Sequence, residues 1–250
     1  MSDPKETRLP PFLALNQRGK TPVFVDILSA PSSSSDIGVA TTININESLA
    51  ILQYLETYYR PDIPLLPPIS CRKERALVLS RVQETENLHH AYDALEDAHF
   101  AAANKSAEPL DGVQRANLIH DVHHELDFWE VYAEKSHFIA GDDFGLADCA
   151  LFPILAYMVH RGFEWRRPTS DNAGDSVTSP TINRKGKVVA EATEVDAWPN
   201  LKAYFDRVWN RGGENGCAQK AQPQGWNRRG KANVWKGTVG KAQPLRESNP

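Results

Sequence analysis

The first sixty residues change from an extended pattern of apolar positions to a helical one. In the segment 22–27, Val23, Val25 and Ile27 alternate with Phe24 and Asp26. A stretch rich in Pro and Ser follows, and a second extended run begins at about residue 37, so the pattern predicts a β-hairpin. After Asn46 the apolar residues adopt a helical spacing that Pro61 and Pro64 end, at Leu49, Ile51, Leu52, Tyr54 and Leu55. Residues 1–60 therefore read as a small unit of a hairpin and a helix.

Helical periodicity dominates the chain after a proline-rich linker at 60–70. The first long helix would bury one face, formed by Val78, Val82, Thr85, Leu88, Tyr92 and Leu95. The next would bury Ile119, Val122, Leu126 and Trp129. The segment 146–160 is apolar almost all round, as is typical of a helix at the centre of a bundle, and Pro153 indicates a kink or a first-turn position.

The remainder of this helical region, 71–212, contains one irregular stretch and one more helix. Residues 162–197 are polar and without a sustained period, which predicts a long loop. Trp198-Pro199 then opens a last helix that buries one face, formed by Leu201, Phe205, Val208 and Trp209. Gly212-Gly213 would close this helix, and the tail 213–250 is expected to be irregular.

Composition indicates an intracellular globular protein. The chain has 250 residues, 41% of them apolar, which is enough for a sizeable core. No apolar run reaches the roughly 18 residues of a membrane span, and the N-terminus does not resemble a secretory signal, so we expect a cytoplasmic protein. Cys71, Cys149 and Cys217 lie far apart without metal-ligand spacing, which favours reduced thiols.

Charge and aromatic residues distinguish the tail from the rest. The net charge is −4, but residues 211–250 hold eight Lys and Arg against two Glu, which leaves the preceding part at −10. Trp226 and Trp235 among these basic residues could stack on nucleic acid. Because no nucleic-acid recognition motif accompanies them, a flexible or partner-binding tail is the favoured interpretation.

Three histidines have a spacing that metal sites also use. His120, His123 and His124 lie at i, i+3 and i+4 of a predicted helix. A solvated helix face explains the same spacing, and the helix already has an apolar stripe. We therefore predict no metal.

Four segments in order resemble the cytosolic glutathione transferase family: FLALNQRGKTPVFVD, INESLAILQYLE, HFIAGDDFGLADCALFPILAY and AWPNLKAYFDRV. The resemblance covers 10–162 and 198–211. It implies an α+β/α fold, with a partial thioredoxin-like N-terminal domain at 1–60 and an all-helical C-terminal domain at 71–212. It also implies glutathione as co-substrate and a homodimer.

The resemblance places a glutathione site on five residues. Thr21, before a cis Pro22, would pair its backbone with the cysteinyl part of glutathione; the alternative is a strand-opening proline without a ligand. Glu47 would meet the γ-glutamyl ammonium, while Ser48 and the helix start meet the carboxylate. Alternatively, Asn46 caps the helix and Glu47 is an ordinary first-turn acid. Lys20 would meet the glycyl carboxylate, unless it is a solvated loop lysine.

The resemblance assigns two further groups. Gly145 stands where the family usually has Ser or Thr at a helix start, and Asp148 would cap the backbone there in a structural role. His89, His90, Tyr92 and Asp93 fall on the helix that lines the acceptor-substrate cleft, so they would shape that cleft or the dimer cleft; core or surface positions are the alternative.

The chain departs from the family at its beginning. The family's first strand, helix and strand carry the Tyr, Ser or Cys that stabilises the glutathione thiolate. Only nine residues precede Pro10 here, and Ser2 and Thr7 stand in the wrong context, so the catalytic residue is unknown. Either the true start lies upstream of Met1 or the activating group is lost, and a marginal N-terminal domain is expected.

The first function that the resemblance implies is that of a glutathione transferase, which would conjugate glutathione to an apolar electrophile such as an intermediate of secondary metabolism. The loop at 162–197 would then cover the acceptor pocket. Two alternatives stay open: a non-catalytic binding or scaffold protein, and a glutathione-dependent isomerase, dehalogenase or sulfur-inserting enzyme.

Overall fold

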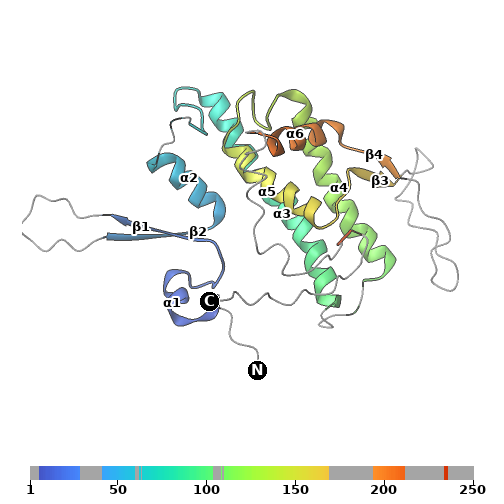
Figure 1. The fold of residues 1–250 in the computed structure, drawn as a ribbon, viewed down its shortest axis with the longest axis horizontal. Helices are drawn as coiled ribbons and strands as arrows, with labels where there is room; N and C mark the ends of the chain where they lie inside the picture. The colour runs from blue at the N-terminus through green and yellow to red at the C-terminus, as the bar shows by residue number, and fades with distance from the viewer. Residues whose placement is uncertain are drawn as a thin grey trace, which may run out of the picture. The chain divides into compact units, whose positions relative to one another are not determined.

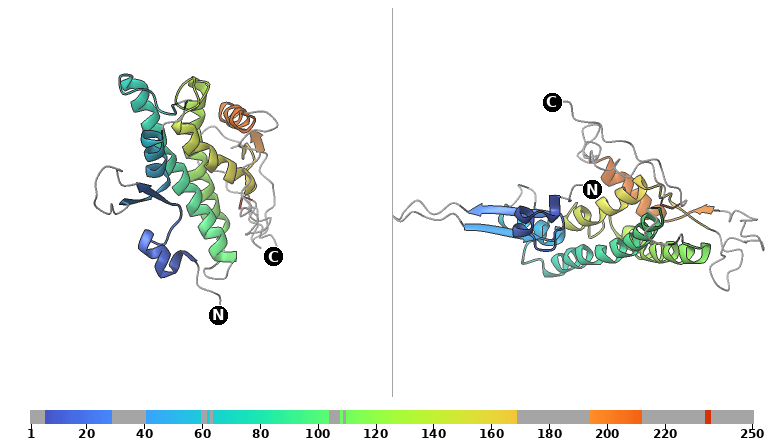
Figure 2. Two further views of the ribbon diagram at one scale, coloured as in Figure 1. Left: turned by 60° about the vertical axis from the view of Figure 1, so that its left-hand side comes forward. Right: turned by 90° about the horizontal axis from the view of Figure 1, so that it is seen from below.

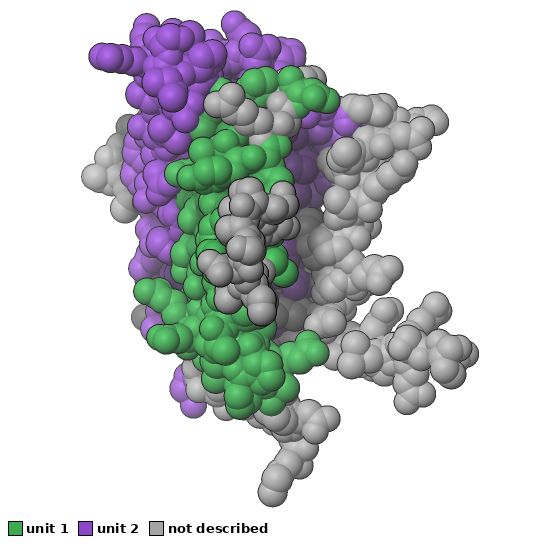
Figure 3. Space-filling model, turned by 90° about the vertical axis from the view of Figure 1, so that its left-hand side faces the viewer, with its two compact units in different colours: residues 1–66 green, residues 67–250 purple. Residues whose placement is uncertain are grey.

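The structure, a computed structural model, describes residues 6–28, 41–59, 62, 64–103, 108, 110–168, 194–211 and 234–235. The chain divides into two compact units, unit 1 at 1–66 and unit 2 at 67–250 (Figure 3). The division falls within the segment 60–70 that the sequence pattern assigns to a linker. Each unit is described below by itself.

Unit 1 consists of a hairpin with one helix after it and short helical turns before it (Figure 1). Its elements are η1 (Glu6–Arg8), α1 (Pro10–Leu15), β1 (Val23–Leu28), β2 (Thr41–Asn46) and α2 (Ser48–Tyr58). The two strands pair antiparallel, which confirms the predicted hairpin, and α2 confirms the predicted helix. Helix α1 was not predicted; it starts with Pro10 at a position where a missing N–H costs nothing.

A buried carboxylate joins the hairpin to α2. Asp26, in the middle of β1, accepts hydrogen bonds from the hydroxyls of Tyr54 and Tyr59, each at 2.7 Å. The Phe24 ring contacts both tyrosine rings, with centroids at 6.0 and 6.2 Å. The buried face of β1 is therefore the one that carries Phe24 and Asp26, whereas Ile27 is exposed.

Unit 2 is a helical bundle (Figure 2). Helices α3 (Arg72–Ala103) and α4 (Gly112–Lys135) run side by side, α5 (Leu146–His160) packs on α3, and α6 (Pro199–Trp209) contacts α4 and α5. All six predicted core residues of α3 are buried, and so are Val122, Leu126 and Trp129 of α4. A spacing of three and four residues puts these side chains on one face, so the sequence pattern alone located this core.

Helix α5 is buried on nearly all sides, as its composition predicts. Pro153 lies in the interior of the helix and is exposed, so the first-turn alternative is wrong. Asp148 reaches back as expected: its carboxylate accepts from the Gly145 N–H at 2.7 Å and from the Ile139 N–H at 3.1 Å. Asp148 thus fixes both the start of α5 and the turn before it.

Helix α6 receives its cap from another helix. The Glu130 carboxylate of α4 accepts from the backbone N–H of Asn200 at 3.1 Å, from its side-chain amide at 2.8 Å, and from the Leu201 N–H at 2.8 Å. These backbone donors have no partner within their own helix. The end that Gly212-Gly213 would form lies outside the described residues.

The stretch predicted as a loop at 162–197 contains a short sheet. Strands β3 (Arg166–Pro168) and β4 (Glu194–Asp196) pair antiparallel, which corrects that prediction at both ends. Three residues are too few to show a period of two, so the pattern could not reveal them. Residues 169–193 are not among those described.

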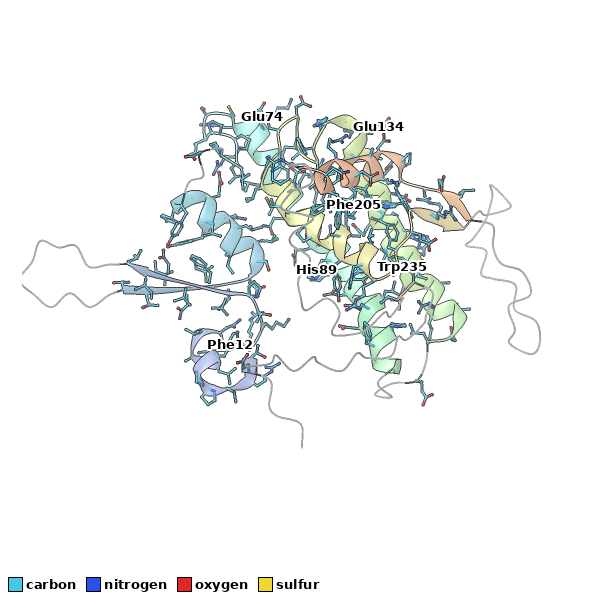
Figure 4. The ribbon with its side chains drawn as sticks, in the orientation of Figure 1. Phe12, Glu74, His89, Glu134, Phe205 and Trp235 are labelled. Atoms are coloured by element: carbon cyan, nitrogen blue, oxygen red, sulfur yellow. The ribbon has the colours of Figure 1, made fainter. Side chains whose placement is uncertain are left out.

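Two residues of the tail, Val234 and Trp235, pack within unit 2; Figure 4 labels Trp235. Val234 is fully buried and its N–H donates to the Arg161 carbonyl at 3.1 Å. The Trp235 ring lies 4.9 Å from Phe163 and 6.2 Å from Tyr92. This part of the tail contributes to the core of unit 2, whereas Trp226 lies outside the described residues.

Two further findings concern the described part of the chain. No helix in it is both long enough and apolar enough to cross a membrane. Cys71 is a free thiol there, and Cys217 is not described.

Candidate functional site

The hairpin brings the two predicted ligand pairs to one end. Val23 of β1 pairs with Asn46 of β2, and this is the first pair of the ladder. Thr21-Pro22 precedes Val23 and Glu47-Ser48 follows Asn46, so the two pairs flank the same end. Residues directly opposite in antiparallel strands have Cα atoms about 5 Å apart, so the two flanking pairs are close neighbours. All four residues are exposed.

The Thr21-Pro22 bond is cis, as the resemblance implies. Neither the N–H nor the C=O of Thr21 forms a hydrogen bond with any residue that the structure describes. An exposed pair of this kind can accept a short extended peptide as an added strand.

The loop before Thr21 is fixed by Asn16 and Gly19. The buried Asn16 side chain donates to the Lys20 carbonyl at 2.7 Å and accepts from the Arg18 N–H at 3.0 Å. Gly19 has φ +60°, and a Cβ there would lie 2.7 Å from the Thr7 carbonyl oxygen. Sequence reasoning missed both residues, although Asn and Gly are the usual residues of such turns. The loop leaves the Lys20 side chain exposed, with no ion pair among the described residues.

Glu47 has an uncommon backbone conformation at the start of α2. Its φ is 71° and its ψ 123°, outside the regions that non-glycine residues favour. Such conformations cluster at functional sites, where the surrounding structure holds them. The Glu47 carboxylate forms no hydrogen bond or ion pair with the described residues.

The first turn of α2 has no side-chain cap. Glu47 occupies the N-cap position without a capping bond, so the alternative in which Asn46 caps the helix is wrong. The first intrahelical bond is donated by Ile51, which leaves the N–H groups of the preceding three residues for another acceptor. The Asn46 Oδ1 atom is buried without a partner. A ligand that carries both an ammonium and a carboxylate would satisfy this end of the helix.

The hydroxyls of Tyr54 and Tyr59 already donate hydrogen bonds to Asp26. Their hydrogen bonds to Asp26 lower the pKa of that carboxyl, with Tyr59 the larger cause. The same bond from Tyr54 raises the Tyr54 pKa to about 12. Neither hydroxyl is free to stabilise a thiolate, so the described residues at the hairpin end offer only the hydroxyls of Thr21 and Ser48.

We expect Asp26→Asn to destabilise unit 1 and to weaken any ligand bound at Glu47. Because the folded pKa of Asp26 is lowered, its contribution is complete above the unfolded value of about 4 and is lost as pH falls below it. Urea unfolding at pH 7 and at lower pH measures this, with Asp62→Asn, an exposed residue of the same unit, as control. Identical unfolding curves for Asp26→Asn and wild type at pH 7 would contradict a stabilising role for the hydrogen bonds that Asp26 accepts from Tyr54 and Tyr59.

The three histidines of α4 do not converge. His123 points inward, with its ring 4.9 Å from Trp198 and 6.1 Å from Trp235. Burial lowers its pKa to about 4, and Arg167 adds to this. His120 and His124 stack on each other and are exposed. Within the described ranges, no three His, Cys, Asp or Glu side chains are grouped to hold a metal.

The residues assigned to the acceptor cleft divide between surface and core. His89 and His90 are exposed and pair with Asp93 at 3.4 Å and Glu86 at 3.8 Å. Tyr92 is buried against Tyr157 and Trp235, and burial raises its pKa. His89 and His90 therefore lie on the surface and Tyr92 lies in the core, and a role of these residues in an acceptor or dimer cleft stays a prediction.

Comparisons with known proteins find similarity to glutathione transferases. Residues 113–207 match the family model of the glutathione S-transferase C-terminal domain. Glutathione S-transferase A from Pleuronectes platessa is 29% identical over 199 residues, which cover 79% of this chain and 73% of that protein. The structure of a glutathione S-transferase from the Antarctic clam Laternula elliptica superposes with a TM-score of 0.60 at 26% identity, covering 93% of this chain and 83% of that chain.

A glutathione transferase homolog from Lodderomyces elongisporus, solved with two GSH per subunit, shares the fold. Its TM-score is 0.52 at 18% identity, with 81% of this chain and 76% of that chain covered. At this identity the likeness concerns the fold alone.

Proposed function

Since this chain is a member of the glutathione transferase-like family, we propose that it binds glutathione through unit 1 and transfers it to an electrophilic small molecule. Its fold joins a small thioredoxin-like unit to a mainly helical unit, as the resemblance implies. The observation that carries the proposal is the single hairpin end where a cis Thr21-Pro22 bond and the Glu47-Ser48 pair meet, each with unpaired polar groups.

The tripeptide would lie along this end in an extended form. The Thr21 N–H and C=O would pair with the cysteinyl backbone, and the Glu47 carboxylate would meet the γ-glutamyl ammonium. The Ser48 hydroxyl and the free N–H groups of α2 would bind the γ-glutamyl carboxylate. Lys20 is the nearest cation in sequence for the glycyl carboxylate.

The chemistry is formation of a carbon–sulfur bond. The glutathione sulfur attacks an electrophilic carbon, the thiol proton leaves, and the electron pair of the carbon's leaving bond departs with its leaving group. A free thiol has a pKa near 8.5, so stabilising the thiolate increases the reactive fraction at neutral pH. The protein's contribution would be orientation of the sulfur by the bound backbone and an apolar acceptor pocket in the helical unit.

We expect Glu47→Gln to weaken glutathione binding about tenfold or more, which is about 1.4 kcal/mol or more. The amide keeps the size of the side chain but removes the charge that meets the ammonium. Calorimetric titration with glutathione measures this, and Glu6→Gln, an exposed acid of the same unit, is the matched control.

The same titration can contradict the proposed glutathione site. A folded wild-type chain without glutathione affinity, or a Glu47→Gln variant with unchanged affinity, would contradict it. A conjugation assay with a generic electrophile tests turnover separately.

A second candidate is a glutathione-binding protein of this family without turnover. The hydrogen bonds of the Tyr54 and Tyr59 hydroxyls to Asp26 favour it, because these two hydroxyls are then not available to activate the sulfur. Binding that Glu47→Gln weakens, with no conjugation of any generic electrophile, would support this candidate over the enzyme.

A further inference from the structure

Helices α3 and α4 line a cavity of about 190 Å³ in unit 2. Its walls consist of two carboxylates, one amide and three aromatic rings, from Glu84, Asn87, Glu125, Phe128, Trp129 and Tyr132. None of these residues belongs to the proposed glutathione site, which lies in unit 1. The cavity is smaller than the roughly 300 to 1,000 Å³ of pockets for drug-sized ligands, so it suits a small head group.

Two residues of the cavity wall, Glu84 and Tyr132, already contact one cation, Arg81. The Arg81 guanidinium lies 3.3 Å from the centroid of the Tyr132 ring, and its Nη1 atom is 2.6 Å from a Glu84 carboxylate oxygen. A ring face below and a carboxylate beside the cation are the two contacts that stabilise guanidinium groups in proteins. This Arg81 arrangement balances the charge of Glu84.

Glu125 has no such counter-ion. Its carboxylate is half-buried and forms no hydrogen bond or ion pair with the residues that the structure describes. Burial raises its pKa, Glu84 adds to this, and the neighbouring His124 opposes it. With Arg81 paired to Glu84, the cavity carries one unbalanced negative charge.

The remaining wall offers a ring face next to this charge. Phe128, one helical turn from Glu125, has a side chain that is still 47% exposed. Residues three apart on a helix are neighbours on its surface. The Asn87 amide supplies a polar group on the α3 side of the cavity.

We propose that this cavity binds one organic cationic group, a guanidinium or primary ammonium on a short apolar stem. Glu125 is its counter-ion and Phe128 is the aromatic wall against which it lies. Such a group occurs on a free amine and on an Arg or Lys side chain of a second copy of this chain. The inference does not depend on glutathione binding, because its residues lie in the other unit.

Agmatine, which carries both cationic groups, is the first probe. Calorimetric titration of the full chain should show binding, and Glu125→Gln should weaken it about tenfold or more. Glu134→Gln changes an exposed acid of the same helix outside the cavity and should leave the affinity unchanged. N-pentylurea, a neutral analogue, should bind more weakly than agmatine to the wild-type chain.

A second variant keeps the test independent of folding defects. Phe128→Leu keeps an apolar wall but removes the ring face, and it should weaken agmatine binding about fivefold, as the loss of a cation–π contact of about 1 kcal/mol requires. Circular dichroism and thermal unfolding of each variant confirm that the folded chain was titrated.

Sedimentation distinguishes the two sources of the cation. If agmatine binds equally at all protein concentrations, a free amine is the ligand. If agmatine dissociates a self-associated form that Glu125→Gln cannot form, the ligand is a side chain of a second copy. Equal agmatine affinity in Glu125→Gln and wild type, or no agmatine binding together with unchanged self-association in the variant, would overturn the proposal.

Discussion

Replacing Glu96 by Leu is expected to lower the free energy of unfolding of the helical unit by about 3–5 kcal/mol. The Arg161 side chain is 3% exposed and that of Glu96 8%, and their Nε and Oε1 atoms lie 3.2 Å apart. The Tyr157 hydroxyl donates to the same carboxylate at 2.8 Å and accepts from the guanidinium at 3.1 and 3.2 Å. Without Glu96 the guanidinium would be buried with no carboxylate partner among the residues described.

The cost of removing one partner exceeds the net value of the pair. Arg161 Nη1 is already buried without a hydrogen bond, so the loss of Glu96 would leave the guanidinium with even fewer acceptors. We therefore expect the double variant Glu96→Leu/Arg161→Met to be closer to wild type than Glu96→Leu alone, because it leaves no buried charge.

Urea unfolding at pH 7 measures both variants. Asp97→Leu, which changes the neighbouring exposed acid of α3, is the matched control and should stay within about 0.5 kcal/mol of wild type. A double variant as unstable as the sum of the two single variants would show that the two side chains do not act as a pair.

Asp148→Ala is expected to cost about 2–5 kcal/mol. The change removes the acceptors of the Ile139 and Gly145 N–H groups, and each donor left unsatisfied in a buried place costs about 1–3 kcal/mol. Asp148 is 1% exposed and Ile139 2%, so water cannot replace both bonds.

A graded series checks this account of Asp148. Asp148→Asn keeps one acceptor oxygen, so its free energy of unfolding should fall between those of wild type and Asp148→Ala. Asp142→Ala changes an exposed acid of the preceding turn, for which the only described hydrogen bond is a long one of 3.5 Å from the His137 N–H, and should have a small effect. Equal losses for Asp148→Ala and Asp142→Ala would contradict the cap.

Both variants change residues of unit 2, the unit that would supply the acceptor pocket, and leave the sequence of unit 1 unchanged. Their glutathione affinity at a temperature where they stay folded should therefore match wild type. This separates the stability of the helical unit from the binding tested through Glu47.

The elements that the sequence predicted have a local cause. The hairpin at 22–43, the helix after Asn46 and the core faces of α3, α4 and α5 follow from periods of 2 and 3.6, which each segment carries by itself. The pairs Thr21-Pro22 and Glu47-Ser48 came instead from the resemblance to the glutathione transferase family, because no local period marks a binding residue. Their neighbourhood at one hairpin end follows from the strand register.

The tertiary structure decided the contacts between residues that lie far apart in the chain. Asp26 meets Tyr54 and Tyr59 over 28 and 33 residues, and Glu130 caps α6 over 70 residues. Trp235 packs on Tyr92 of α3. A periodic pattern states only that a side chain faces inward, whereas the partner it meets there depends on how the elements pack. The sequence by itself therefore determined the long helices and the hairpin of this protein. Packing alone determined which carboxylates cap helices or bond across elements and which, like Glu125, have no counter-ion among the described residues.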